Sequence, residues 1–174
     1  MKLLLLLVIL GAVAYFAPAP VGHAEQAVEI NADRNRVWGV LADLYSARLW
    51  DPGMKDMKFA GDVKTGTEAE RYSEEGMVKT REKVREWIAY NRLVFDVTHD
   101  PKITKFETST IAVEPGTTSN STRIRWTLDY RMAGGYLGQF ADKFLLGSVH
   151  GGRISEGLSN LKRYAETGET PPTL

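Results

Sequence analysis

The longest regular pattern of apolar residues runs from Tyr136 to Ala165, where apolar positions recur at alternating spacings of three and four. This spacing keeps them on one side of a helix with 3.6 residues per turn. The stripe consists of Leu137, Phe140, Phe144, Gly147, Gly151, Ile154, Leu158, Leu161 and Ala165. A continuous helix over this span would be roughly 45 Å long. We therefore expect a long amphipathic helix at the C-terminal end, lying on a large apolar surface.

Two glycines, Gly147 and Gly151, stand at the centre of this stripe. Each costs about 1 kcal/mol relative to alanine in a helix interior. One interpretation is a kink or break at Gly151-Gly152. The other is that the helix lies over a hollow, in which the glycines leave room. The pattern alone leaves both interpretations open.

The remaining pattern predicts a strand, a helical pair and six further strands. The first strand covers residues 25–32, and Asp33 is positioned to cap a helix whose apolar face ends near Leu44. Trp38 and Trp50 are expected in the core, and a turn follows at Asp51-Pro52-Gly53. Alternation of apolar and polar residues then predicts strands at 57–60, 67–73, 77–87, 92–98, 105–113 and 123–132. One apolar face on each strand indicates an α+β fold in which a curved antiparallel sheet wraps around the long helix.

The N-terminus carries an apolar run of 14 residues, Leu3 to Phe16, after Met1-Lys2. A membrane-spanning helix needs about 20 apolar residues, and a signal-peptide core needs roughly 7–15. Gly22-His23-Ala24 fits cleavage after Ala24, so residues 1–24 read as a signal peptide. The alternative is an uncleaved inner-membrane anchor formed by residues 3–21. Both place a domain of residues 25–168, with a tail of 169–174, outside the cytoplasm or in the periplasm.

Composition excludes several classes of site. The 174 residues include no cysteine, so neither a disulfide nor a thiolate nucleophile can form. The formal net charge is zero, which gives no electrostatic reason to expect nucleic acid. No phosphate-binding loop or nucleophile elbow is present, and we expect no cofactor. His23, by this division, belongs to the removed or tethering segment. We expect no metal site, although His99 and His150 with a carboxylate are a minor alternative. His150 lies beside the helix stripe and is either a polar contact at the cavity or an ordinary surface histidine.

Several phrases, in this order, resemble one family. They are VEINADRNRVWGVLADLYSARLWDP, VREWIAYNRLVFDV, STRIRWTLDYRM and GGYLGQF…GRISEGLSNLKRYAE. Together they are similar to the START/Bet v 1-like (SRPBCC) superfamily, and within it to the polyketide cyclase/dehydrase and lipid-transport family. The resemblance implies a helix-grip fold with a ligand cavity between the sheet and the C-terminal helix. It carries over no active-site residue, because the family shares no single catalytic motif.

The large inward-facing residues are the candidate ligand contacts. They are Tyr72, Phe95, Phe106, Trp126, Leu128, Tyr130, Phe140, Phe144, Gly147 and Gly151. The favoured function is binding, which can extend to transport, of a hydrophobic lipid-like or polycyclic small molecule. The alternatives are a cyclase/dehydratase-type enzyme that uses a buried acid–base residue, and an envelope protein that binds a partner. A filled core would argue against a cavity.

Glu82 is the single candidate for catalysis. Along 77–87 it shares a face with Val78, Thr80 and Val84, while the opposite face carries only basic residues. The basic face belongs in water, so Glu82 is expected to point inward. Desolvation between apolar neighbours would raise its pKa and make it a candidate general acid or base. Alternatively, Glu82 lies at a wet rim or pairs with a basic residue.

Overall fold

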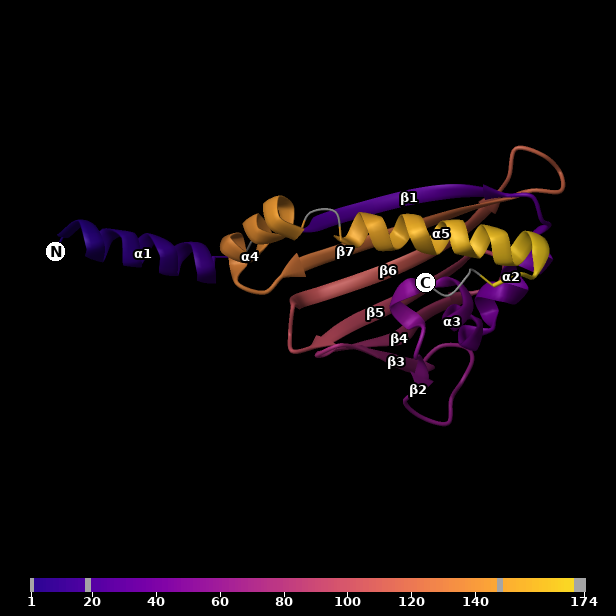
Figure 1. The fold of residues 1–174 in the computed structure, drawn as a ribbon, viewed down its shortest axis with the longest axis horizontal. Coiled ribbons are helices and arrows are strands. Elements are labelled where there is room, and N and C mark those ends of the chain that lie inside the picture. Colours follow the sequence, from indigo (N-terminus) through magenta and orange to yellow (C-terminus); the bar gives the residue numbers. More distant parts are fainter. Residues whose placement is uncertain (1, 18–19, 147–148, 171–174) are drawn as a thin grey trace.

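The computed structural model describes residues 2–17, 20–146 and 149–170. These residues form a seven-stranded antiparallel sheet in the order β1-β7-β6-β5-β4-β3-β2, and helix α5 lies along one face of it (Figure 1). The strands are β1 (Gly22–Ile30), β2 (Lys58–Phe59), β3 (Glu70–Glu75), β4 (Val78–Ile88), β5 (Arg92–Asp100), β6 (Thr104–Pro115) and β7 (Thr122–Met132). The helices are α1 (Lys2–Phe16), α2 (Arg34–Ala42), α3 (Ala47–Trp50), α4 (Gly135–Ala141) and α5 (Val149–Thr167), with short helical turns η1 (Leu44–Ser46), η2 (Pro52–Met54) and η3 (Asp142–Leu146).

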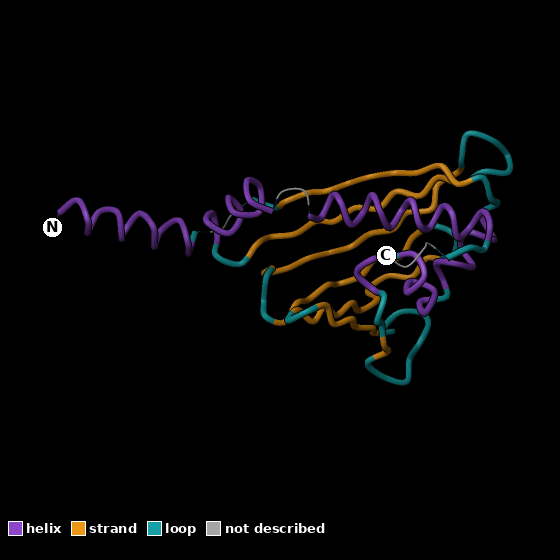
Figure 2. Tube along the Cα trace, viewed as in Figure 1, coloured by secondary structure: helices purple, strands orange, loops and turns teal. Residues whose placement is uncertain are grey.

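The core lies between α5 and the sheet, as the sequence predicts. From α5 it receives Ile154, Leu158, Leu161 and Ala165, which are almost fully buried. From the sheet it receives Phe95, Ile111, Ile124, Trp126 and Leu128. Figure 2 shows the strands as one layer, with α5 beside it, α2 and α3 near one end and α4 at the other. The α+β helix-grip architecture is confirmed.

The helical pair after β1 is confirmed as well. The carboxylate of Asp33 accepts a hydrogen bond from the Arg36 amide at 3.0 Å and caps α2. Trp38 packs edge-to-face on Trp87, with ring centroids 5.7 Å apart. Trp50 packs in the same manner on Trp126 at 5.8 Å. Both tryptophans are core residues, and they fix the short helices to opposite parts of the sheet.

The first strand begins three residues earlier than expected, at Gly22 instead of Glu25. His23 therefore belongs to the sheet and not to a tether. It pairs with Asp129 on β7, and its Nδ1 lies 2.7 Å from Asp129 Oδ1. Cleavage after Ala24 would divide this strand, so cleavage and the boundary at residue 25 stay predictions.

The prediction of one helix from Tyr136 to Ala165 is wrong. The chain forms α4, then the π-helical turn η3, and α5 begins at Val149, so Gly151 and Gly152 lie inside α5 and not at a break. A π-helical turn adds a residue to the helical period and rotates the helix before it relative to the helix after it. The apolar stripe therefore holds from Ile154 onward, whereas Leu137, Phe140 and Phe144 are exposed. Gly147 lies outside the described residues.

Helix α1 extends from the sheet at the end where α4 lies (Figure 1). Its 15 residues include none that is buried, and it contacts α4. Among the residues that the structure describes, no helix combines the length and apolar character needed to cross a membrane.

Candidate functional site

A row of polar side chains crosses the inner face of the sheet. The strand register places Arg71 opposite Glu82, Glu82 opposite Val97, Val97 opposite Glu107, and Glu107 opposite Tyr130. Residues directly opposite each other on neighbouring strands project from the same face. All five are buried. The surface that faces α5 is therefore crossed by ionisable groups and is not uniformly apolar.

At one end of the row, Glu82 lies between two guanidinium groups. Arg71 donates to Glu82 Oε2 from Nη2 at 2.7 Å and from Nε at 3.0 Å. Arg153, from α5, donates to Glu82 Oε1 at 3.2 Å and to Asp51 Oδ2 at 2.9 Å. Burial opposes the charge of Arg153, but Asp51 and Glu82 outweigh this effect and raise its pKa. The inward direction predicted for Glu82 is confirmed, and its partners match the alternative in which it pairs with basic residues.

In the middle of the row, Glu107 accepts a hydrogen bond from His99. The distance between His99 Nε2 and Glu107 Oε2 is 2.9 Å, and His99 Nδ1 lies 3.1 Å from the Thr80 hydroxyl. Burial alone would raise the pKa of Glu107. The hydrogen bond from His99 and the charges of His99, His150 and Arg153 together exceed that effect, so the pKa of Glu107 is lowered.

At the far end, the Tyr130 hydroxyl donates to Asp142 Oδ2 at 2.6 Å. His150 of α5 lies over the Tyr130 ring, with centroids 4.4 Å apart, and its Nε2 is 3.7 Å from Asp142 Oδ1. Burial and the neighbouring Asp142 carboxylate raise the pKa of Tyr130, so its phenol stays a donor at neutral pH. His150 thus lies against the end of the polar row and does not stand free on the helix surface.

A pocket opens beside the middle of this row. Strands β5 and β6 pair only as far as Val97 and Glu107, and a β-bulge follows in β6 between Thr104 and Phe106. Where the strands part, a pocket of about 450 Å³ is lined by His99, Thr104, Phe106 and Glu107 and by exposed charged residues, Arg85, Asp96, Lys102 and Lys105. Bulges commonly re-aim side chains in this manner beside binding sites.

Thr104 is an unusual member of this lining. It lies opposite Met132, on the face that also carries Tyr130, and is 3% exposed. Its hydroxyl has no hydrogen-bond partner among the described residues. A buried hydroxyl without a partner is destabilising by about 1–3 kcal/mol. Thr104 thus borders the pocket with a hydroxyl that is buried and, within the described part of the chain, has a free hydrogen-bonding capacity.

The predicted ligand contacts are found in three places. Phe95, Trp126 and Leu128 are in the core, and Tyr130 is in the polar row beside them. Phe106 is at the pocket and is 39% exposed. Tyr72 is on the outer face of β3, under the Lys79 ammonium at 4.0 Å from the ring centroid.

Phe140 and Phe144 do not lie near Trp126. They stack on each other at the exposed end of the domain, with ring centroids 4.5 Å apart. A methyl group added at Gly151 would meet no atom within 4 Å, so space does exist beside this glycine. The structure thus joins four of the predicted residues into one inner surface and separates Tyr72, Phe140 and Phe144 from it.

The sequence interpretation missed His99, Glu107, Asp142 and Arg153 as parts of one network. Glu107 could have been predicted to point inward in the same way as Glu82, because it shares a strand face with the apolar Ile111 and Val113. Asp142 was not, because its position depends on the π-helical turn. Within the described ranges, no three acidic or histidine side chains are arranged to hold a metal ion.

As the pH falls below 4.5, the Glu107 contact should stop stabilising the fold. A carboxylate whose pKa is lowered by folding contributes stability above its unfolded-state pKa, and this contribution is lost as the pH falls through the folded-state value. Thermal unfolding of the wild type and of Glu107→Gln should therefore differ most near neutral pH, and the difference should shrink in acid. A difference that stays constant from neutral to acid pH would mean that ionised Glu107 is not preferentially stabilised in the folded state.

The curved antiparallel sheet and the closing helix define a Bet v 1-like, helix-grip protein. More specifically, the chain belongs to the family described as polyketide cyclase/dehydrase and lipid transport, whose sequence profile matches residues 22–166. The match begins where β1 begins. No protein with a curated description matches the chain in sequence.

Solved structures share the fold at low sequence identity. An uncharacterized protein from Bacillus thuringiensis is 19% identical with a TM-score of 0.65, over 83% of this chain and 98% of that one. A protein from Thermus thermophilus is 17% identical with a TM-score of 0.63, over 83% and 97%. Norcoclaurine synthase from Thalictrum flavum, in complex with dopamine and hydroxybenzaldehyde, is 15% identical with a TM-score of 0.60, over 88% and 90%. At these identities the likeness concerns the fold alone.

Proposed function

We propose that the protein binds a hydrophobic small molecule, lipid-like or polycyclic, that carries at least one hydroxyl or carbonyl group. The site is the pocket where β5 and β6 part, which is bordered by the exposed side chains of Arg85, Asp96 and Lys105 and reaches the buried Thr104 and Glu107. The observation that carries the proposal is the buried Thr104 hydroxyl, which lacks a partner among the described residues and lines the same pocket as the His99–Glu107 pair. Ligand pockets of this size class combine apolar walls with a few placed polar groups.

The chemistry of the lining supports an amphipathic ligand. Val97 and Phe106 supply apolar contact, and Thr104 can both donate and accept a hydrogen bond. The charged side chains of Arg85, Asp96, Lys102 and Lys105 line the same pocket and suit the polar end of such a ligand. His99 Nε2 and Glu107 Oε2 already form a hydrogen bond with each other, so these two atoms are not available to a ligand. A ligand hydroxyl or carbonyl would therefore be recognised chiefly through Thr104, with the His99–Glu107 pair beside it.

Two probes that differ by one hydroxyl test this recognition. We expect Thr104→Val to weaken binding of 1-naphthol by about two- to tenfold, which is the loss of affinity that corresponds to one hydrogen bond. Binding of naphthalene, which has no hydroxyl, should be unchanged. Fluorescence titration of the full chain measures both affinities. Thr110→Val is the matched control, because Thr110 is on the same strand but on the opposite face. Equal losses for both probes, or no loss for either, would count against Thr104 as the recognition group.

A second candidate function is acid–base catalysis. The inner face brings together one phenol, two imidazoles and three carboxylates, from Tyr130, His99, His150, Glu107, Asp142 and Glu82. Groups of this kind can transfer protons to and from a bound molecule. The norcoclaurine synthase complex provides a synthase with the same fold. Mass spectrometry separates the two functions. A compound that is recovered from the purified full chain is incubated with fresh protein and analysed again. The same mass supports binding, and a new mass supports catalysis.

A further inference from the structure

We propose that α1 and the neighbouring face of α4 and η3 dock together on a lipid bilayer. The α4 face consists of Tyr136, Leu137, Phe140 and Phe144, which are 49–63% exposed. Three of these residues, Leu137, Phe140 and Phe144, are those that the helical pattern had assigned to the packed stripe. In the folded chain they have no core to pack on.

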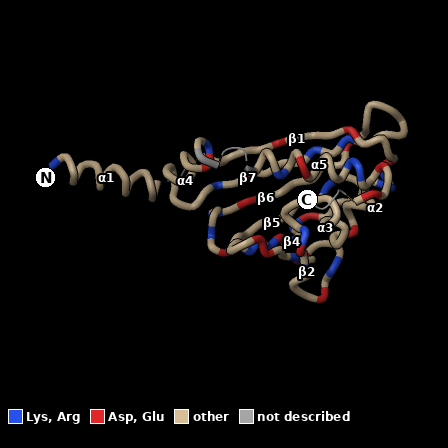
Figure 3. The backbone as a smooth tube through the Cα atoms, in the orientation of Figure 1, with Lys and Arg blue, Asp and Glu red and all other residues tan. Residues whose placement is uncertain are grey.

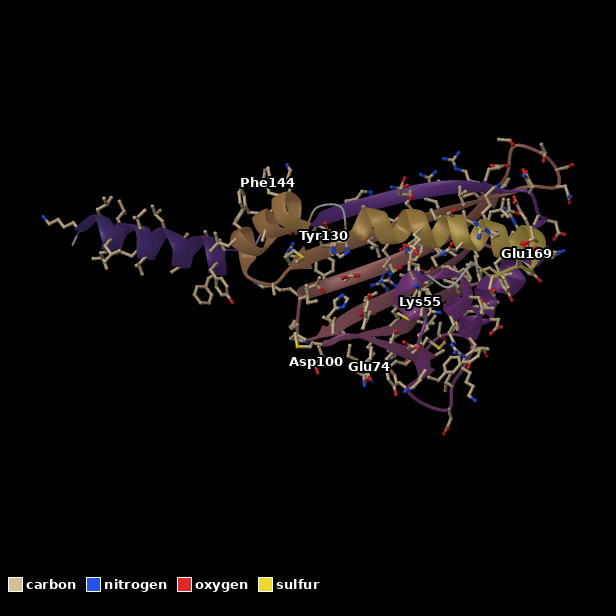
Figure 4. The ribbon with its side chains drawn as sticks, viewed as in Figure 1. Lys55, Glu74, Asp100, Tyr130, Phe144 and Glu169 are labelled. Carbon is tan, nitrogen blue, oxygen red and sulfur yellow. The ribbon has the colours of Figure 1, made fainter. Side chains whose placement is uncertain are left out.

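The α4 face is apolar as a surface and not only as a sequence. With Pro20, Gln139 and Lys143 it lines a shallow, open pocket of about 360 Å³. Asp142, the acidic residue of η3, is turned away from it and bonds Tyr130 in the interior. Figure 4 shows Phe144 projecting from the outer side of this segment, whereas Tyr130 lies beneath α5. Contiguous exposed apolar patches of this kind mark contact surfaces.

Helix α1 continues the same surface. Gly135, at the start of α4, lies against the end of α1, where an added methyl group would collide with the carbonyl oxygens of Ala14, Tyr15 and Ala17. The two helices are therefore in direct contact, with no side chain between their backbones at this point. Every side chain from Leu3 to Phe16 is apolar, and none is buried in the fold.

The composition of α1 indicates that lipid, and not a partner protein, covers its side chains. A groove on a partner protein covers one side of a helix, and such helices carry a polar face toward water. Helix α1 carries apolar residues on all sides, and its one charged residue is Lys2 at the outer end (Figure 3). A bilayer surrounds a helix completely, so it satisfies this pattern where a groove would not. The aromatic rings of α4 and the ammonium of Lys143 then fall at the base of α1, where interfacial aromatic and basic residues belong.

Lipid docking of α4 can be measured separately from insertion of α1. The chain contains no cysteine, so Phe144→Cys and Met77→Cys each provide a single labelling position for the fluorophore NBD in the full chain. Met77 is 94% exposed and lies at the turn between β3 and β4, and strands β5 and β6 separate β4 from β7, the strand that leads into α4. The vesicles contain phosphatidylcholine, phosphatidylglycerol and a nitroxide-labelled lipid.

On vesicles we expect NBD at position 144 to shift to the blue, gain intensity severalfold and be quenched by the nitroxide, while NBD at position 77 stays as in water. A label at 144 that remains water-exposed on bound protein would show that α1 inserts alone and would overturn the proposal. A blue shift that depends on protein concentration without vesicles would identify a second copy as the occupant and would also overturn it.

A label-free comparison provides the second measurement. Phe140→Ser combined with Phe144→Ser should lower the vesicle partition coefficient of the full chain by at least about tenfold, because two phenyl rings leave the lipid phase. Met77→Ser removes an apolar side chain that is even more exposed, at 94%, and should leave partitioning unchanged. Equal partitioning of the double variant and the wild type contradicts the inference. Thermal unfolding of both variants checks that the fold is retained.

Discussion

Glu82→Leu should lower the free energy of unfolding by about 3–5 kcal/mol, because it leaves the Arg71 guanidinium buried without its carboxylate. The side chains of Arg71 and Glu82 are each 3% exposed, so water cannot take the place of the lost partner. Arg153 retains Asp51, and the charge that becomes unpaired is therefore that of Arg71. Urea unfolding at neutral pH measures the difference.

Strand β4 supplies a matched control for this substitution. Glu86 accepts from Arg92 Nε at 3.0 Å and Nη2 at 2.6 Å through one oxygen, the same geometry in which Glu82 accepts from Arg71. The Glu86 and Arg92 side chains are 35% and 46% exposed. Exposed pairs contribute about 0–1 kcal/mol, so Glu86→Leu should change the stability by no more than this. Similar losses for the two leucine variants would show that burial does not set the energy of the Glu82 pair.

The sheet was predictable because its signals are local. Alternation along β7 fixes which of its side chains face inward, and Asp33 marks the start of α2 through its own hydrogen bond. These features depend on neighbours within a few residues. The two tryptophans after β1 could be assigned to the core on size alone, and Trp38 and Trp50 are buried there.

The division of the C-terminal helix was not predictable, because it depends on distant contacts. Gly135 packs on the carbonyl groups of α1, more than a hundred residues away in the sequence, and Asp142 bonds Tyr130 across the interior. A helical period counted along the sequence assumes that the helix is continuous. Once η3 interrupts it, the assignments of Phe140 and Phe144 to the inner stripe fail together.

The site was predictable only in part, for the same reason. Alternation placed Glu82 inside, and it would have placed Glu107 inside as well. Their partners come from other elements: Arg153 from α5 and His99 from β5. The register of the strands and the position of α5 on the sheet decide these pairings. Neither can be predicted from the spacing of residues within one segment. The sequence thus indicated single inward acids, whereas the fold assembled a charge-paired row.

Alanine at two glycines of α5 should change the stability in opposite directions. Gly151→Ala meets no atom within 4 Å, so the helix should gain up to about 1 kcal/mol of stability. At Gly157 an added methyl would lie 2.6 Å from Trp126 Cζ3. Overpacking of this kind is destabilising by about 1–3 kcal/mol, more than the helix gains.

The Trp126 ring cannot easily move away from that methyl. Its Nε1 donates to the Ser109 hydroxyl at 2.9 Å, and Trp50 packs against it edge-to-face. Urea unfolding of the two alanine variants measures the signs directly, and each variant serves as the control for the other because both occupy α5. If both alanines stabilise the protein equally, α5 does not press on Trp126. Opposite signs would locate the tight contact of the closing helix at Gly157, leaving the space beside Gly151 open.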